Sequence, residues 1–145
     1  MKIIEGGVTA SKGFESASTE AGIKYKNRKD MAMIYSQTPC KAAGTFTTNI
    51  VKAAPVKWDQ KIVKESEFAQ AVVINAGIAN ACTGAEGLGY CEKTAQAVAE
   101  VLNVPTDAVL VASTGVIGMQ LPIEKLENGI KAMVPNLDGS IESGT

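Results

Sequence analysis

Residues 71–115 read AVVINAGIANACTGAEGLGYCEKTAQAVAEVLNVPTDAVLVASTG, and this stretch decides the expected fold. Its first residues, 71–74, form an apolar run typical of a buried strand, which ends at Asn75. A helix is predicted over Glu86–Leu102, because one face carries apolar residues at steps of three and four. These residues are Cys91, Ala95, Val98, Ala99 and Leu102. A second buried strand, 107–112, leads into the corner Ser113-Thr114-Gly115, and this order of elements is an α/β pattern.

Helices are also predicted on both sides of this stretch. Pro122 suits the first position of a helix, where a missing amide hydrogen costs nothing. The inward residues of this helix are expected to be Ile123, Leu126, Ile130 and Met133. Pro135 and Asn136 end it. Upstream, we expect Asp59 to cap a short helix that runs through Glu67, because its carboxylate can accept amide hydrogens of the first turn.

The N-terminal half is predicted to supply strands. Met31–Tyr35 is a compact apolar run that suits a buried strand, and Gln37-Thr38-Pro39 is expected to be a turn. Residues 42–48 (AAGTFTT) are small and β-prone, and they predict another strand. We interpret residues 6–29 as an edge hairpin or a long loop with short strands. The tail, 136–145, has no clear period.

Composition excludes several classes of function. The 145 residues are 46% hydrophobic and 20% charged, which argues against intrinsic disorder. Histidine is absent, so Ser-His-Asp and Cys-His catalysis within this chain are excluded. A net charge of −1 disfavours nucleic acid as a partner. No apolar run approaches the roughly 20 residues that span a bilayer, so no membrane role is expected.

Cysteine content and charge distribution further limit the expected compartment and binding partners. The 3 cysteines form no CxxC pair, and we find no signal sequence, so a reducing cytoplasm is the expected compartment. Residues 1–70 carry 11 Lys and Arg against 7 Asp and Glu, whereas residues 71–145 carry 3 against 8. We interpret this asymmetry as two halves of one domain that attract each other weakly, rather than as a binding patch.

The corner Ser113-Thr114-Gly115 is one of two candidate functional segments. A strand that ends in Thr-Gly can present a hydroxyl and the adjacent glycine amide to one point. Two such donors aimed at a developing oxyanion stabilise it, and a glycine lets the reacting group approach closely. A plain turn after a core strand explains the same residues, so spacing alone leaves both interpretations open.

The loop Asn75–Gly89 is the second candidate. Its glycines offer amides near a helix start, where anions are favoured, but the order matches neither a dinucleotide nor a Walker motif. Cys82 lies in this loop, and a small buried thiol is a simpler interpretation than a nucleophile. The remaining notable side chains, Trp58, Met31 and Met33, are best explained by packing. Glu124 and Glu127 fit a solvated helix face, and no metal site or cofactor site is predicted.

Four segments together resemble one family. They are Glu5-Gly6-Gly7-Val8-Thr9-Ala10, residues 44–56 (GTFTTNIVKAAPV), residues 79–84 (ANACTG) and residues 111–118 (VASTGVIG). In this order they are similar to the N-terminal part of the ornithine acetyltransferases, the bifunctional glutamate N-acetyltransferases of arginine biosynthesis. The resemblance runs from residue 3 to about 135.

The resemblance implies a precursor that cleaves itself before an internal threonine into an α and a β chain. That threonine of β would be the nucleophile, and acetyl would pass from N-acetylornithine to glutamate through an acetyl-threonine. Acetyl-CoA serves some members as a donor, and no other cofactor is implied. The resemblance assigns Thr114, by its hydroxyl, and Gly115, by its amide, to the oxyanion hole. It also implies a layered αββα sandwich completed by the second chain, in αβ units that pair as α2β2.

The resemblance further implies that residues 1–145 are a single domain, a truncated N-terminal part of the family α chain, because the sequence stops before the expected nucleophile. Ala76 and Ile78 depart from the family pattern Asn-Ser-Gly-Asn-Ala-Asn, in which a hydroxyl and an amide stand at these positions. Two alternatives therefore stay open. One is a related self-processing amidase or aminopeptidase, and the other is a non-catalytic α/β domain that binds a small molecule or a protein.

Overall fold

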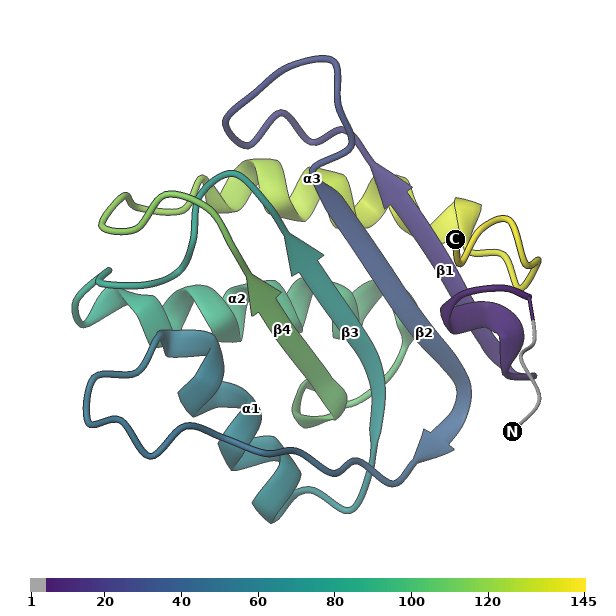
Figure 1. The fold of residues 1–145 in the computed structure, drawn as a ribbon, viewed down its shortest axis with the longest axis horizontal. Helices are drawn as coiled ribbons and strands as arrows, with labels where there is room; N and C mark the ends of the chain where they lie inside the picture. The colour runs from purple at the N-terminus through teal and green to yellow at the C-terminus, as the bar shows by residue number, and fades with distance from the viewer. Residues whose placement is uncertain (1–4) are drawn as a thin grey trace.

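A four-stranded sheet organises the chain, in a computed structural model that describes residues 5–145. The strands are β1 (Phe14–Thr19), β2 (Met31–Cys40), β3 (Ala69–Asn75) and β4 (Val109–Ser113), in the order β1-β2-β3-β4. The first three run antiparallel, and β3 and β4 run parallel with Asn75 opposite Ser113. The loops that follow β1, β3 and β4 therefore meet at one end of the sheet (Figure 1).

Helices cover one face and one edge of this sheet. The helices are α1 (Ala54–Glu65), α2 (Glu86–Leu102) and α3 (Ile123–Met133), with short 3-10 turns at Val8–Ala10, Thr106–Ala108 and Val134–Asn136. Figure 1 shows α2 and α3 side by side behind the sheet and α1 beside β4. The main core lies between the sheet and α2 and α3, and it includes Met33, Val73, Val98, Val109 and Ile130.

The opposite face of β2, β3 and β4 is apolar, and no α-helix lies over it in the described residues, whereas Val8 and residues 143–145 lie against its β1 side. Side chains alternate along a strand, so the neighbours of the buried Met33, Val73 and Val111 point away from the helices. They are apolar and half-buried: Ala32, Ile34, Val72, Ile74, Leu110 and Ala112. A soluble sheet commonly alternates apolar and polar residues on such a face, so this composition is typical of a sheet with two covered faces.

Several predicted elements are confirmed. The helix over Glu86–Leu102 has the expected bounds, and it ends where Asn103 takes the left-handed conformation (φ 55°). The helix after Pro122 is also present, and Leu126, Ile130 and Met133 are buried along it. The mixed α/β class is confirmed as well, and so is the strand over Met31–Tyr35.

Three local predictions are wrong. Residues 42–48 form no strand, since most of them are exposed and apolar burial is too small to hold them in a sheet. Gln37-Thr38-Pro39 is not a turn but a continuation of β2, where the pairing register shifts and a proline without an amide hydrogen is tolerated. Asp59 caps nothing, because α1 begins at Ala54 with Pro55 in its first turn.

The edge of β4 explains what Asp59 does instead. Its carboxylate accepts a hydrogen bond from the Val111 amide (2.9 Å), and the neighbouring Trp58 indole donates to the Val109 carbonyl (3.0 Å). Two adjacent helix side chains thus satisfy backbone groups that an edge strand would otherwise expose. Burial raises the pKa of Asp59 from 3.8 to about 6, and the hydrogen bond from Val111 only partly opposes this rise.

Candidate active site

The Ser113-Thr114-Gly115 corner lies where β4 ends, held against the loop that follows β3. The Thr114 amide donates to the Asn75 carbonyl (3.0 Å), and the Val116 amide donates to the Gly77 carbonyl (3.1 Å). In return the Ala79 amide donates to the Val116 carbonyl (2.9 Å). Parallel pairing of β3 and β4 thus continues past both strand ends and fixes the path of the corner.

Gly115 cannot be replaced without moving this backbone. Its φ is +130°, a conformation that side chains rarely adopt. A Cβ added there would lie 2.3 Å from the carbonyl carbon of Gly77 and 2.7 Å from the Ile78 nitrogen. The close approach of two loops therefore requires the glycine, independently of any catalytic role.

The donors that the sequence assigns to this corner are exposed. Thr114 and Gly115 are solvent-accessible, and none of the hydrogen bonds that fix the corner uses the Thr114 hydroxyl or the Gly115 amide. The preceding Ser113 is used differently, because its hydroxyl accepts from the Asn80 amide (2.9 Å) and donates to the Ile78 carbonyl (3.3 Å). Ser113 thus supports the corner, while Thr114 and Gly115 can face a ligand.

A buried polar residue that sequence reasoning missed, Asn80, ties the corner to its surroundings. Asn80 is 1% exposed, and its side-chain amide donates to the Gly87 carbonyl (2.8 Å) in α2. Its side-chain oxygen accepts from the Thr83 hydroxyl (2.7 Å), and its backbone amide reaches Ser113. A buried asparagine with every contact satisfied specifies one arrangement of a loop. In the sequence, the signal for this role is that the polar Asn80 stands between the small residues Ala79 and Ala81.

The two departures from the family pattern lie beneath the corner rather than on its surface. Ile78 is buried and belongs to the main core. Its carbonyl accepts hydrogen bonds from both Asn75 (2.8 Å) and Ser113. Ala76 is half-buried, and its amide donates to the Asp30 carbonyl (2.8 Å). The side chain of Ile78 therefore contributes to the packing of the main core.

The cysteines differ in what their surroundings allow. Cys91 is fully buried, and burial, together with the nearby charge of Asp59, raises its pKa to about 12, so it stays a thiol. Cys82 is exposed, contrary to the expectation of a buried thiol. It has a φ of 55° and lines a cavity of about 260 Å³ with Lys52, Lys57 and Leu88. In residues 5–145, no three His, Cys, Asp or Glu residues are grouped as a metal site would require.

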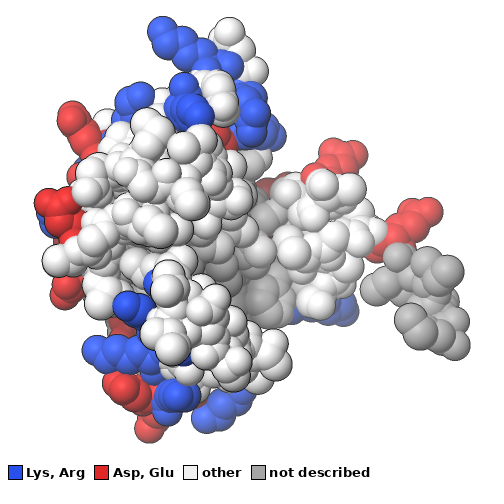
Figure 2. Space-filling view, turned by 60° about the vertical axis from the view of Figure 1, so that its left-hand side comes forward, with Lys and Arg blue, Asp and Glu red and all other residues white. Residues whose placement is uncertain are grey.

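Apolar side chains surround the corner. The exposed ones on this side come from the loops before α1 and after β4 and from the start of α2: Ile50, Val51, Leu88, Val116, Ile117 and Met119. Figure 2, which brings this side of the molecule forward, shows a broad uncharged surface between two groups of Lys and Arg. An exposed apolar surface of this kind commonly marks a ligand or protein contact.

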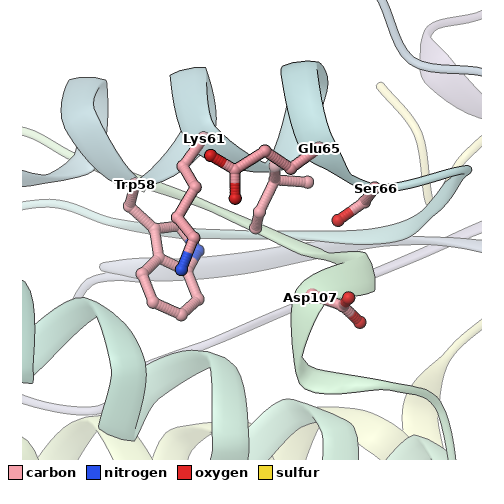
Figure 3. Close-up of a pocket in the computed structure, with 6 residues that line it drawn as sticks. Trp58, Lys61, Glu65, Ser66 and Asp107 are labelled. Atoms are coloured by element: carbon pink, nitrogen blue, oxygen red, sulfur yellow. The ribbon is translucent and has the colours of Figure 1, made fainter.

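A separate cavity of about 280 Å³ lies at the other end of β4. Trp58, Lys61 and Glu65 from α1 line it, and Asp107 faces them from the turn before β4 (Figure 3). Its charges are mixed, and it contains neither Thr114 nor Gly115. It is therefore not the site that the sequence predicts. No helix within residues 5–145 combines the length and apolarity that crossing a bilayer demands.

Comparison with known proteins decides the family. The model of the ArgJ family matches residues 15–144. The chain belongs to the ArgJ family. An ArgJ relative described as the arginine biosynthesis bifunctional protein of Thermotoga neapolitana is 50% identical over 127 residues, which are 87% of this chain and 32% of that protein. The corresponding ArgJ protein of Gloeobacter violaceus is 46% identical over 142 residues, which are 98% of this chain and 34% of that protein.

Solved ArgJ structures share the fold. The bifunctional ArgJ protein of Bacillus halodurans superposes with a TM-score of 0.91 at 38% identity, over 99% of this chain and 74% of that one. The ornithine acetyltransferase of Mycobacterium tuberculosis, solved in complex with ornithine, superposes with a TM-score of 0.91 at 41% identity, over 96% of this chain and 75% of that one. The chain thus spans about a third of the length of its curated ArgJ relatives.

Proposed function

We propose that this chain is the oxyanion-stabilising part of an acetyltransferase that moves an acetyl group from N-acetylornithine to glutamate. The exposed Thr114–Gly115 corner carries this proposal, because it offers a hydroxyl and an amide from a rigid backbone. Preorganised donors of this kind stabilise the charge that develops on a carbonyl oxygen. Membership of the ArgJ family and the ornithine complex of a structural neighbour support the choice of substrates.

The chemistry proceeds in two halves. A threonine hydroxyl at the N-terminus of the β chain attacks the acetyl carbonyl of N-acetylornithine, and the α-amine of the same threonine takes the hydroxyl proton. The C–N bond breaks, ornithine leaves with that proton on its amine, and an acetyl-threonine remains. The amine of glutamate then attacks this ester and releases N-acetylglutamate and free threonine. Thr114 and Gly115 stabilise the oxyanion of both tetrahedral intermediates, and no histidine is needed.

The β chain is also proposed to cover the open face of the sheet. That face presents Ile34, Val72, Ile74 and Leu110 without a helix over it in residues 5–145. Burying apolar area releases about 25 cal/mol per Å², so such a face favours a second layer. The remaining length of the ArgJ relatives is sufficient to supply one. We propose an αβ unit that pairs as α2β2 in the cytoplasm.

Substitution of Thr114 tests the proposal. In the enzyme assembled from this chain and the family remainder, Thr114→Ala is expected to lower kcat for acetyl transfer by roughly 10²–10³, the effect of one lost oxyanion donor. Thr114→Ser is the matched control, since it keeps the hydroxyl and stays within about threefold of wild type. An unchanged kcat in the alanine variant contradicts the assignment. Hydrolysis of peptide amides in place of acetyl transfer supports the amidase alternative.

Processing is tested separately by mass. Co-expression of the whole precursor is expected to yield two chains, the second beginning with threonine. A single uncut species excludes the proposed nucleophile and leaves a non-catalytic binding domain as the better interpretation.

A further inference from the structure

The cavity at the opposite end of β4 from the Thr114–Gly115 corner is lined by side chains of both charges. Its volume is about 280 Å³, and its walls come from the second half of α1 and from the turn before β4. The lining residues are Trp58, Lys61, Ile62, Glu65, Ser66 and Asp107. Ligand pockets begin at about 300 Å³, so a cavity of this volume suits a small metabolite.

One wall of this cavity is apolar and fixed. The Trp58 indole donates a hydrogen bond to the Val109 carbonyl (3.0 Å), which holds the ring at the edge of β4. Ile62 follows one turn later in α1 and is 4% exposed. A ring whose N–H group is already bonded presents its apolar surface to a ligand. The wall therefore fits an uncharged side chain, aliphatic or aromatic.

The charged groups beside this wall are open to solvent. Lys61, Glu65 and Asp107 are exposed, and within residues 5–145 neither an ion pair nor a hydrogen bond engages their side chains. Lys61 precedes Glu65 by one helical turn, an order less favourable for an ion pair than the reverse. In Figure 3, Trp58 and Lys61 lie at one end of the cavity, and Ser66 and Asp107 lie at the other. One cation and two anions around one space match a ligand that carries both charges.

The end of α1 favours a cation in one part of this cavity. The helix ends at Glu65, and Ser66 is its C-cap. Carbonyl groups at a helix C-terminus carry partial negative charge, so an ammonium group is favoured there. A carboxylate is favoured at Lys61, one turn earlier. An α-amino acid carries both groups on one carbon atom, which suits charged side chains one helical turn apart.

We propose that this cavity binds a free α-amino acid with an apolar side chain. The ligand's carboxylate contacts the Lys61 ammonium, and its ammonium group lies between Glu65 and Asp107. Its side chain packs on Trp58 and Ile62. Each ligand charge then meets an opposite charge, whereas a diamine leaves Lys61 unpaired and a dicarboxylate is repelled by two carboxylates. Because binding uses no group of the corner, it is independent of the proposed acetyl transfer.

Calorimetric titration of the assembled enzyme with L-phenylalanine tests this binding. We expect one saturable site with a Kd of about 1 mM. N-acetyl-L-phenylalanine lacks the ammonium group, and L-phenylalaninamide lacks the carboxylate. Each is expected to bind about fivefold more weakly, the effect of one lost exposed ion pair. Binding of either compound as tightly as the free amino acid overturns the proposal.

A paired substitution tests the two carboxylates. Glu65→Gln/Asp107→Asn is expected to raise Kd for L-phenylalanine about tenfold. The matched control, Glu100→Gln/Glu127→Gln, removes the same charge from a cavity of about 150 Å³ that also has mixed charges. Within residues 5–145 that cavity has no aromatic lining, so the control is expected to keep wild-type affinity. Equal affinity of wild type and the Glu65/Asp107 variant overturns the proposal.

Amide hydrogen exchange then locates the ligand. L-phenylalanine is expected to slow exchange in residues 54–67 and 105–112, which border the cavity, and to leave residues 113–119 unchanged. Protection at 113–119 alone overturns the proposal, because it places the ligand at the corner. Tighter binding of L-lysine than of L-phenylalanine also overturns it, because the side chain then does not lie on the apolar wall.

Discussion

Replacement of Gly115 by alanine tests whether the rigid backbone at the end of β4 is what makes the corner catalytic. The added Cβ would lie 2.3 Å from the Gly77 carbonyl carbon, whereas ordinary contact begins at 3.4 Å, so one backbone segment must move by about 1 Å. A positive φ costs a side chain about 1–3 kcal/mol. The hydrogen bond from Val116 to Gly77 would weaken as well, at about 1 kcal/mol. We therefore expect Gly115→Ala to lose about 2–4 kcal/mol of unfolding free energy.

The catalytic consequence follows from the same displacement. A misplacement of about 1 Å costs roughly 10² in rate, so kcat for acetyl transfer should fall by about that factor. Gly118→Ala is the matched control, because Gly118 also has a positive φ (78°) but its Cβ would meet nothing within 4 Å. It should cost about 1 kcal/mol of stability and leave kcat within threefold. Urea unfolding and steady-state kinetics measure both quantities, and a folded Gly115→Ala enzyme with wild-type kcat would refute the reasoning.

Three further results are expected from residues around the site. Asn80→Ala should lower the free energy of unfolding by about 2–4 kcal/mol, since it leaves buried polar groups without partners, and a loss below 1 kcal/mol in urea would contradict its supporting role. The pKa of Asp59 is about 6 in the folded protein, against 3.8 for an unperturbed aspartate, so the folded chain holds a proton that the unfolded chain releases. The free energy of unfolding therefore falls as pH rises from about 4 to 6. The free energy of unfolding of Asp59→Asn should therefore match that of wild type near pH 4 and exceed it by about 1 kcal/mol at pH 7. The full pKa difference corresponds to about 3 kcal/mol, which solvent screening reduces. Equal melting curves at pH 7 would exclude this effect. Iodoacetamide should label the exposed Cys82 before the buried Cys91 in native protein, as mass spectrometry would show, and equal rates would mean that α2 opens readily.

The errors of sequence reasoning have identifiable physical origins. Local preference predicts a strand at 42–48, but most of these residues are exposed, and side chains of α1 already satisfy the edge of β4. Asp59 has the chemistry of a helix cap, yet Pro55 starts the helix earlier and leaves Asp59 to bond Val111. At the edge of β4, contacts between residues far apart in sequence outweigh the local signal, whereas at Asp59 a nearby proline moves the start of the helix.

The charge asymmetry of the chain illustrates the same limit. From sequence, an excess of cations in residues 1–70 was interpreted as attraction between two halves of a domain. Four of these cations, Lys24, Lys26, Arg28 and Lys29, are neighbours in the sequence, and the fold places this basic loop beside Gly77. A count over each half of the chain does not show this position, because it does not record which loops meet at one end of a sheet.

The sequence by itself determined the alternation of strands and helices in residues 71–133, because apolar periodicity reports which face of each element is buried. Its short motifs also singled out Thr114 and Gly115 as candidate donors. Only the tertiary structure decided how the ends of β1, β3 and β4 come together, since this depends on strand order and register. That arrangement pins the corner against Gly77, places Asn80 beneath it and brings the basic loop alongside it, through contacts that no local pattern encodes.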